Sequence, residues 1–196
     1  MKIGIAGGIG SGKSYVCRII EQHGFKVYDC DREAKRLIRN STEIRERLTD
    51  LIGQQAYDET TGEDGQPSYR LNKAVVADFL LDSARNARAI NQIVHPAVLK
   101  DFRESGLQWL ESALMFESGA YKTVDKVVAV IAPKDVRISR VMKRDHITRE
   151  EVLEWMARQM DQKDIIQKSD FVVINDGQTD IDKQLNKIFK QCNKQF

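Results

Sequence analysis

Met1 to Ser14 reads MKIGIAGGIGSGKS, and this stretch decides the fold. Residues 2–6 form a short, mostly apolar run that predicts a β-strand. Residues 7–14 fit the pattern G-x-x-x-x-G-K-[ST] of a P-loop. Glycines allow the chain to curl so that successive backbone N–H groups point inward and form an anion-binding nest. A helix that begins at Lys13 would direct the positive end of its dipole at the same anion.

The side chains of this loop predict a nucleoside triphosphate with Mg²⁺. Lys13 can place a positive charge at the β- and γ-phosphates, and the Ser14 hydroxyl is positioned to ligate Mg²⁺. The expected nucleotide-binding residues are Gly8, Gly10, Ser11, Gly12, Lys13, Ser14 and Tyr15.

The composition is that of a globular protein with one full core and a small inserted lobe. Of the 196 residues, 41% are hydrophobic, and the net charge of +2 is too balanced to indicate a nucleic-acid partner. Three cysteines at wide spacing form neither a disulfide framework nor a zinc pattern, and thiols fit a reducing cytosol. The longest apolar run, 127–133, is too short to span a membrane, and no targeting segment precedes the first strand. We therefore expect a cytoplasmic protein that binds neither nucleic acid nor membrane.

Hydrophobic periodicity predicts alternating helices and strands beyond the loop. A helix over 13–23 and a strand over 25–28 complete a βαβ unit, which implies a parallel sheet. We expect a three-layer α/β sandwich with two helical elaborations, one between the second and third strands and one after the strand at 125–132. The further expected helices are 32–53 (broken near Asn40, with Ser41 capping the second piece), 71–105 (with a bend at Pro96), 134–160 (broken at 146–148, with a Thr148–Glu151 capping box) and 179–191. The further expected strands are 107–115, 125–132 and 170–174. Residues 54–70, which contain Gly62, Gly65 and Pro67, are expected to form an exposed loop.

The candidate catalytic residues lie where parallel strands end, because open parallel sheets bind ligands beyond the carboxyl ends of their strands. Asp29 and Asp31 follow the second strand. A carboxylate at Asp31 could accept a hydroxyl proton during phosphoryl transfer. The alternative is that one of these two residues only caps the next helix.

Other charged residues have both a functional and a structural interpretation. Glu111 and Glu117 could hold Mg²⁺ through water, although Glu111 could equally lie on a solvated strand face. Arg140 and Arg144 are four residues apart and share a helix face that could stabilise transition-state charge, although such faces are usually just solvated. His95 lies in an apolar neighbourhood, which favours a partly buried histidine over a catalytic one.

The chain resembles the dephospho-CoA kinase family over nearly its whole length. Its P-loop alone is shared by many families, but the ordered set of motifs at these spacings is specific. The motifs are IAGGIGSGKS at 5–14, VYDCD at 27–31, IVHP at 93–96, ALMFE at 113–117, RVMKRD at 140–145, TREE at 148–151, QM at 159–160 and SDFVVIN at 169–175.

The resemblance implies a P-loop kinase that uses ATP to phosphorylate the ribose 3′-hydroxyl of dephospho-CoA, the last step of coenzyme A synthesis. It implies that Asp31 is the general base, that Arg140 and Arg144 bind phosphate from a lid, and that Asn175 lies near the adenine of ATP. It also implies one kinase domain over 1–196, with a helical acceptor-binding insertion over 32–105 and a helical lid over 136–165.

The acceptor set implied by the resemblance comprises Asp31, Lys35, His95 and Glu117. Lys35 stands where the family commonly has Arg, so the charge is kept while the bidentate fork is lost. Tyr15 stands where the family usually has Thr or another small residue, and only its backbone N–H is needed for phosphate. Ala113 and Met115 replace Pro and Leu, which affects little chemistry.

Two other functions are compatible with the P-loop. One is another small P-loop kinase that acts on a nucleoside, nucleotide or metabolite. The other is a GTP-binding switch, since residues 50–53 read DLIG and match its short Asp-x-x-Gly pattern. That segment follows a helical stretch instead of a strand, and no Asn-Lys-x-Asp motif for guanine occurs. We expect a monomer or a weak homo-oligomer.

Overall fold

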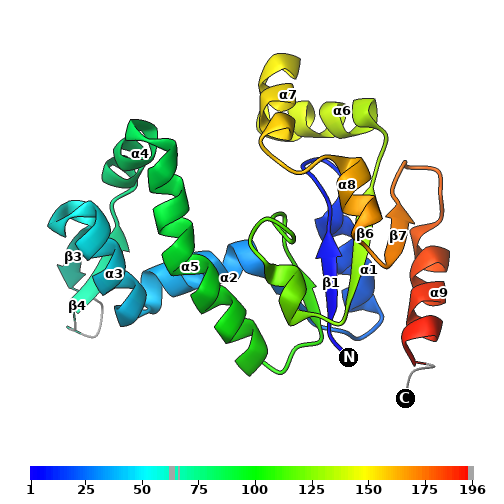
Figure 1. The fold of residues 1–196 in the computed structure, drawn as a ribbon, viewed down its shortest axis with the longest axis horizontal. Coiled ribbons are helices and arrows are strands. Elements are labelled where there is room, and N and C mark those ends of the chain that lie inside the picture. Colours follow the sequence, from blue (N-terminus) through cyan, green and yellow to red (C-terminus); the bar gives the residue numbers. More distant parts are fainter. Residues whose placement is uncertain (62–64, 66, 194–196) are drawn as a thin grey trace. The chain divides into compact units, whose positions relative to one another are not determined.

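The computed structural model describes residues 1–61, 65 and 67–193 and divides the chain into two compact units. The first unit consists of Met1–Asp29 and Gly106–Phe196, and the second of Cys30–Ser105. Figure 1 shows their elements along the chain.

The first unit is built on a parallel sheet. Its described strands are arranged in the order β2-β5-β1-β6-β7, so the central strand β1 carries the phosphate loop at its carboxyl end. Ile3 of β1 is paired with Trp109 on one side and with Lys126 on the other. The predicted α/β fold with a central parallel sheet is confirmed. The strands are β1 (Ile3–Ala6), β2 (Val27–Asp29), β5 (Trp109–Glu111), β6 (Lys126–Ile131) and β7 (Phe171–Ile174).

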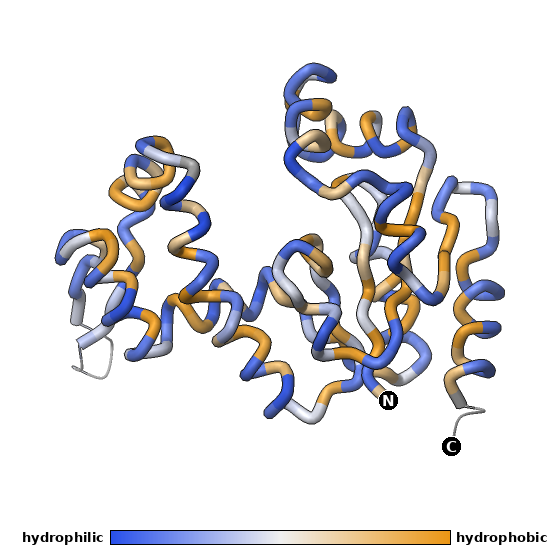
Figure 2. Tube along the Cα trace, viewed as in Figure 1, coloured by the Kyte–Doolittle hydropathy of each residue, from blue (hydrophilic) through white to orange (hydrophobic). Residues whose placement is uncertain are grey.

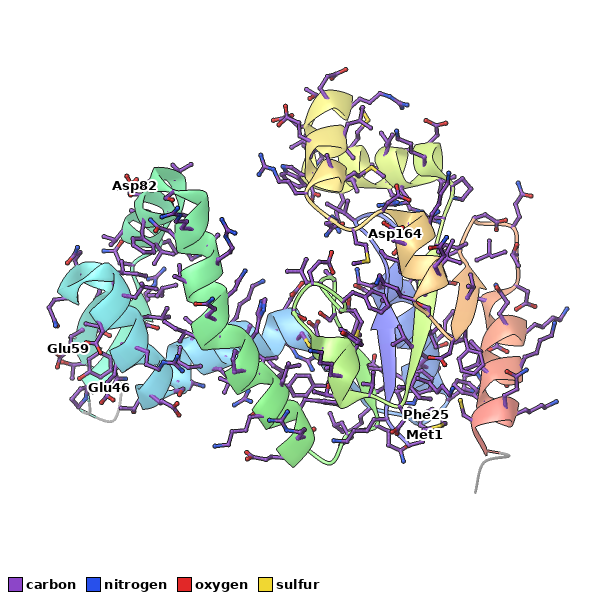
Figure 3. All side chains as sticks on the ribbon, in the orientation of Figure 1. Met1, Phe25, Glu46, Glu59, Asp82 and Asp164 are labelled. Atoms are coloured by element: carbon purple, nitrogen blue, oxygen red, sulfur yellow. The ribbon has the colours of Figure 1, made fainter. Side chains whose placement is uncertain are left out.

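Helices cover both faces of this sheet, because the strands are apolar on both faces, as buried parallel strands are. On one face, α1 (Lys13–Gln22) and α9 (Ile181–Asn193) pack their buried residues against the side chains of Ile5 and Val128. On the other face, α8 (Gln162–Gln167) contacts β6. There a Cβ added to Gly4 would lie 2.8 Å from the Met115 side chain. In Figure 2, hydrophobic residues, drawn in orange, recur along β6, β7 and α9.

Two helices after β6 form a further small cluster. α6 (Lys134–Asp145) ends at His146, which adopts a left-handed conformation with φ of 56°. α7 (Arg149–Ala157) begins after Thr148, which forms the predicted capping box with Glu151. Buried side chains of the two helices pack together with Ile9 of the phosphate loop. The predicted break over 146–148 is confirmed, whereas the separate short helix α8 was not predicted.

The second unit has its own core. Ile44, Leu48, Tyr57 and Ile93 are buried together in it. Ser41 caps α3 by accepting a hydrogen bond from the N–H of Ile44, as predicted. The elements are α2 (Cys30–Asn40), α3 (Thr42–Ile52), η1 (Gln54–Ala56), β3 (Tyr57–Thr61), β4 (Pro67–Leu71), α4 (Lys73–Asp82) and α5 (Ala84–Glu104).

The prediction of an exposed loop over 54–70 is wrong. Its flanks form a short 3₁₀ helix and the antiparallel hairpin β3–β4, in which Tyr57 pairs with Leu71 and Glu59 with Tyr69. Tyr57 is buried and donates a hydrogen bond to the carbonyl of Ile38, so apolar contacts anchor a segment that looks polar in sequence. The predicted turn residue Gly62 lies outside the described residues.

Three other predicted boundaries need correction. The helix over 71–105 is two helices, because Ser83 is extended and caps α5, which then continues through Pro96. The strand over 107–115 is limited to β5, because the chain turns after Glu111 and the Ser112 hydroxyl accepts a hydrogen bond from the Leu114 N–H. The second strand ends at Asp29 and α2 begins at once with Cys30, so Asp31 belongs to the first helical turn.

Candidate active site

Glycines of the phosphate loop are required both by conformation and by close packing. Gly10 and Gly12 have φ values of 77° and 88°, a region that favours glycine. A Cβ on Gly10 would lie 2.5 Å from the carbonyl oxygen of Arg137. A Cβ on Gly12 would overlap the Asn175 side chain. The loop therefore fits closely against α6 and against the residue that follows β7.

Lys13 is held inside the first unit by one hydrogen bond and one ion pair. Its Nζ donates a hydrogen bond of 2.9 Å to the Gly7 carbonyl and lies 3.6 Å from Glu111 Oε1. The Glu111 residue is 8% exposed, so the alternative of a solvated strand face is excluded. The ammonium group is thus positioned at the loop by a buried carboxylate on the neighbouring strand β5.

Both backbone polar groups of Ile9 form hydrogen bonds with side chains. Its N–H donates to Gln159 Oε1 at 2.7 Å, and its carbonyl accepts from Arg137 Nε at 2.8 Å. From the sequence, Gln159 is identified only as part of the motif QM at 159–160, and Arg137 is given no role of its own. One signal was available, since Arg137 shares the inner face of α6 with Ile138 and Val141.

Asn175 joins three segments of the site. Its Nδ2 donates to the Ser11 carbonyl at 2.9 Å. Its Oδ1 and its backbone carbonyl accept hydrogen bonds from Arg140 at 3.2 and 3.0 Å. Arg140 Nη1 also lies 3.5 Å from the Gly10 carbonyl. The structure therefore brings Arg140 and Asn175 to the phosphate loop.

Arg144 has a different partner from Arg140. Its guanidinium forms two hydrogen bonds with the adjacent Asp145, at 2.8 and 2.7 Å, and is largely exposed. This hydrogen-bonded pairing lowers the pKa of Asp145 and raises that of Arg144. The pair lies at the end of α6, on the solvent side.

A pocket of about 270 Å³ adjoins Asn175. One wall is α1, where the exposed Tyr15 and the half-buried Ile19 are one turn apart, and the other is the segment between β7 and α9. The Ser14 hydroxyl belongs to the first turn of α1 and is exposed. The lining residues are Tyr15, Ile19, Asn175, Gly177, Thr179, Asp180, Ile181 and Asp182.

Glu117 forms a hydrogen bond with the segment that follows α7. Its Oε1 accepts a hydrogen bond of 3.0 Å from the Met160 N–H. This contact immediately follows Gln159, the residue that holds Ile9. Glu117 thus supports the same side of the phosphate loop.

The other predicted site residues belong to the second unit. Asp31 and Lys35 are exposed and one turn apart on α2, with Asp31 in the first turn, where the helix dipole favours a carboxylate. His95 of α5 is half-buried, and this burial lowers its pKa, which the Asp31 carboxylate partly opposes. Arg36 of α2 forms an ion pair of 2.7 Å with Asp101 of α5. Asp31 and His95 therefore lie on two helices, α2 and α5, that pack together.

Comparison with known proteins identifies the family. The family model described as dephospho-CoA kinase matches residues 1–180. The chain belongs to the dephospho-CoA kinase family. A dephospho-CoA kinase of Bacteroides fragilis is 35% identical over 196 residues, which cover 94% of this chain and 89% of that protein.

Solved structures show the same fold. A Thermus thermophilus crystal structure matches with a TM-score of 0.79 and 28% identity, covering 97% of this chain and 96% of that one. Dephospho-CoA kinase from Campylobacter jejuni matches with a TM-score of 0.64 and 20% identity, over 99% and 98% of the two chains, and supports the fold. As a member of the dephospho-CoA kinase family, the chain is a kinase of the P-loop type.

Within residues 1–61, 65 and 67–193, no helix has the length and apolar character needed to cross a bilayer. In the same residues, no group of three or more His, Cys, Asp and Glu side chains is arranged to hold a metal ion.

Proposed function

We propose that this chain transfers the γ-phosphoryl group of ATP to the ribose 3′-hydroxyl of dephospho-CoA and so completes coenzyme A. The observation that carries the proposal is the phosphate loop with Lys13 held in place, in a chain of the dephospho-CoA kinase family. Phosphoryl transfer depends mainly on positioning and on charge stabilisation, which a preorganised loop supplies.

The loop binds the ATP phosphates in this proposal. The backbone from Gly8 to Tyr15 surrounds them, and Lys13 counters the charge between the β- and γ-phosphates. The adenine occupies the pocket beside Asn175. Asn175 also contacts the phosphate loop, because its side chain donates a hydrogen bond to the Ser11 carbonyl.

Mg²⁺ fits the donor set of this loop. Mg²⁺ usually takes one or two protein oxygens and completes its octahedron with phosphates and water, so it does not require a cluster of carboxylates. The exposed Ser14 hydroxyl would hold it, and the ion would neutralise charge on the phosphates when bound. Glu111 pairs with Lys13, so in our proposal it positions that lysine.

Asp31 is the proposed general base. Its place in the chain supports this role, because it follows Asp29 at the carboxyl end of β2, the same edge of the sheet at which β1 leads into the loop. Asp31 orients the 3′-hydroxyl and takes its proton as the new bond to phosphorus forms. Lys35 and His95 in the unit Cys30–Ser105 bind the acceptor, with Glu117 completing the set.

The helices after β6 form the proposed lid over 136–165. Arg140 and Arg144 close on the transferring group, stabilise its charge and exclude water that would otherwise hydrolyse ATP. Arg144, whose side chain is exposed, would exchange its partner Asp145 for phosphate. The proposed setting is a cytoplasmic monomer or weak homo-oligomer, with ATP and dephospho-CoA as partners.

An acceptor panel tests this proposal. The purified chain is incubated with Mg-ATP and, in turn, dephospho-CoA, adenosine, AMP, deoxyadenosine and shikimate, and ADP release is measured. We expect rapid ADP release with dephospho-CoA alone. Equal or faster release with another acceptor would assign the chain a different substrate.

A further inference from the structure

Arg137 is a buried cation that the proposed reaction does not use. The residue is 7% exposed, and burial lowers its pKa, opposed by the carboxylate of Asp161. Among the described residues, no carboxylate lies within ion-pair distance of its guanidinium. Burying a charge without a paired counter-charge is costly, whereas a neutral side chain of similar size would avoid this cost. A positive charge at this place therefore requires a reason beyond packing.

The guanidinium is directed into the phosphate loop. Nε donates to the Ile9 carbonyl at 2.8 Å, and Nη1 lies 3.5 Å from Gln162 Oε1. Nη2 lies 2.5 Å from the position that a Cβ on Gly8 would occupy. Nη2 has no acceptor among the residues that the structure describes.

The conformation of Gly8 is consistent with this interpretation. Its backbone does not have the positive φ that favours glycine, unlike Gly10 and Gly12. Glycine at this position leaves room for the Arg137 guanidinium, which would have to shift if a side chain were added. The loop and the buried cation fit each other.

The same contact links the loop to the helices after β6. Ile9 is bound through its N–H by Gln159 and through its carbonyl by Arg137, and its side chain packs among Ile138, Val141 and Val152. The first turn of the loop and the base of α6 thus form one packed body.

We propose that Arg137 is a positioning residue for polyphosphate binding. It fixes the loop through the Ile9 carbonyl, and its buried charge, with Nη2 at Gly8, favours ligands that carry more phosphates. The inference rests on the proposed role of the loop in binding ATP. Because the charge acts in a site of low dielectric, its effect should grow with the charge of the ligand.

Nucleotide binding to three variants tests the inference. Arg137→Gln removes the charge, Arg137→Lys keeps it, and Arg149→Gln is the control, since Arg149 is exposed and pairs with Asp135 on the surface. Dissociation constants for ATP, ADP and AMP are measured by calorimetry, with melting curves to establish folding.

We expect Arg137→Gln to weaken ATP binding about tenfold, which corresponds to about 1.4 kcal/mol. ADP should lose less, and AMP should stay within about twofold of the unmodified chain. Arg137→Lys should restore most of the ATP affinity, and the control should change nothing. In turnover, the KM for ATP should rise while the KM for the acceptor stays constant.

Two results would overturn the inference. One is ATP affinity within twofold of the original in folded Arg137→Gln, and the other is an equal loss for ATP and AMP. If Arg137→Gln does not fold, Arg137→Lys decides the question: a retained preference for ATP over AMP supports the inference, and a lost preference refutes it. Failure of the proposed function is a separate result, since it would leave these binding differences in place while dephospho-CoA remained unphosphorylated.

Discussion

Replacing Glu111 by Gln should destabilise the nucleotide-free protein much more than the ATP-bound protein. Lys13 Nζ lies 3.6 Å from Glu111 Oε1, and the two side chains are 10% and 11% exposed. Breaking a buried ion pair typically costs about 3–5 kcal/mol, because the remaining charge is left without compensation. Since this pair is longer than a hydrogen bond and Lys13 keeps the Gly7 carbonyl as acceptor, we expect about 2 kcal/mol, below that range.

The assay is thermal unfolding with and without saturating Mg-ATP. For a chain of this size, about 2 kcal/mol corresponds to a decrease in Tm of roughly 4–8 °C. Bound phosphates would take over the compensation of Lys13, so the difference in Tm should fall to less than half with Mg-ATP. Glu154→Gln, at an exposed position of α7, is the control and should change neither Tm. An equal decrease with and without nucleotide would refute the reasoning, because Lys13 would then not exchange Glu111 for phosphate.

Three other substitutions test separate parts of the account. Gly12→Ala should abolish ATP binding measured by calorimetry, because the new Cβ would overlap the Asn175 side chain. Gly24→Ala is the control and should bind ATP normally, because Gly24 has the same φ of 88° but open space around its Cβ position. Burial lowers the folded-state pKa of His95, so as pH drops below about 6.5 the unfolded chain takes up the proton first and the free energy of unfolding falls. His95→Gln should therefore reduce the loss of free energy of unfolding between about pH 7 and 5, measured by urea unfolding. An unchanged pH dependence would show that His95 titrates alike in both states. Asp31→Asn should keep ATP affinity and lose at least about a hundredfold in turnover, and nearly normal turnover would show that Asp31 is not the base.

The phosphate loop could be predicted almost completely from sequence. Glycine spacing, Lys13 and the following amphipathic helix are local signals, and each is decided by backbone geometry within a few residues. The parallel sheet followed from the same logic, because a strand, helix and strand in close succession leave one favoured topology. The break at His146 was predictable for a similar reason, since a capping box is a pattern of side chain and backbone within one turn.

Features that depend on distant contacts could not be predicted in this way. The hairpin β3–β4 looks like a loop because its apolar anchors Tyr57 and Leu71 stand apart among polar residues. Arg137 shares a helix face with Ile138 and Val141, but its contacts with Gly8 and Ile9 join residues that are far apart in sequence. The pairing of Glu111 with Lys13 requires that β5 lie next to β1, which the order of strands along the chain does not reveal.

The most direct measurement of the central claim is the position of the transferred phosphate. The chain is incubated with Mg-ATP and dephospho-CoA, and the product is fragmented in a mass spectrometer, with the 3′-deoxy analogue of the acceptor as control. The account predicts one added phosphate on the adenylyl ribose of the product and none on the analogue. A phosphate elsewhere on the acceptor, or transfer to the analogue, would contradict it.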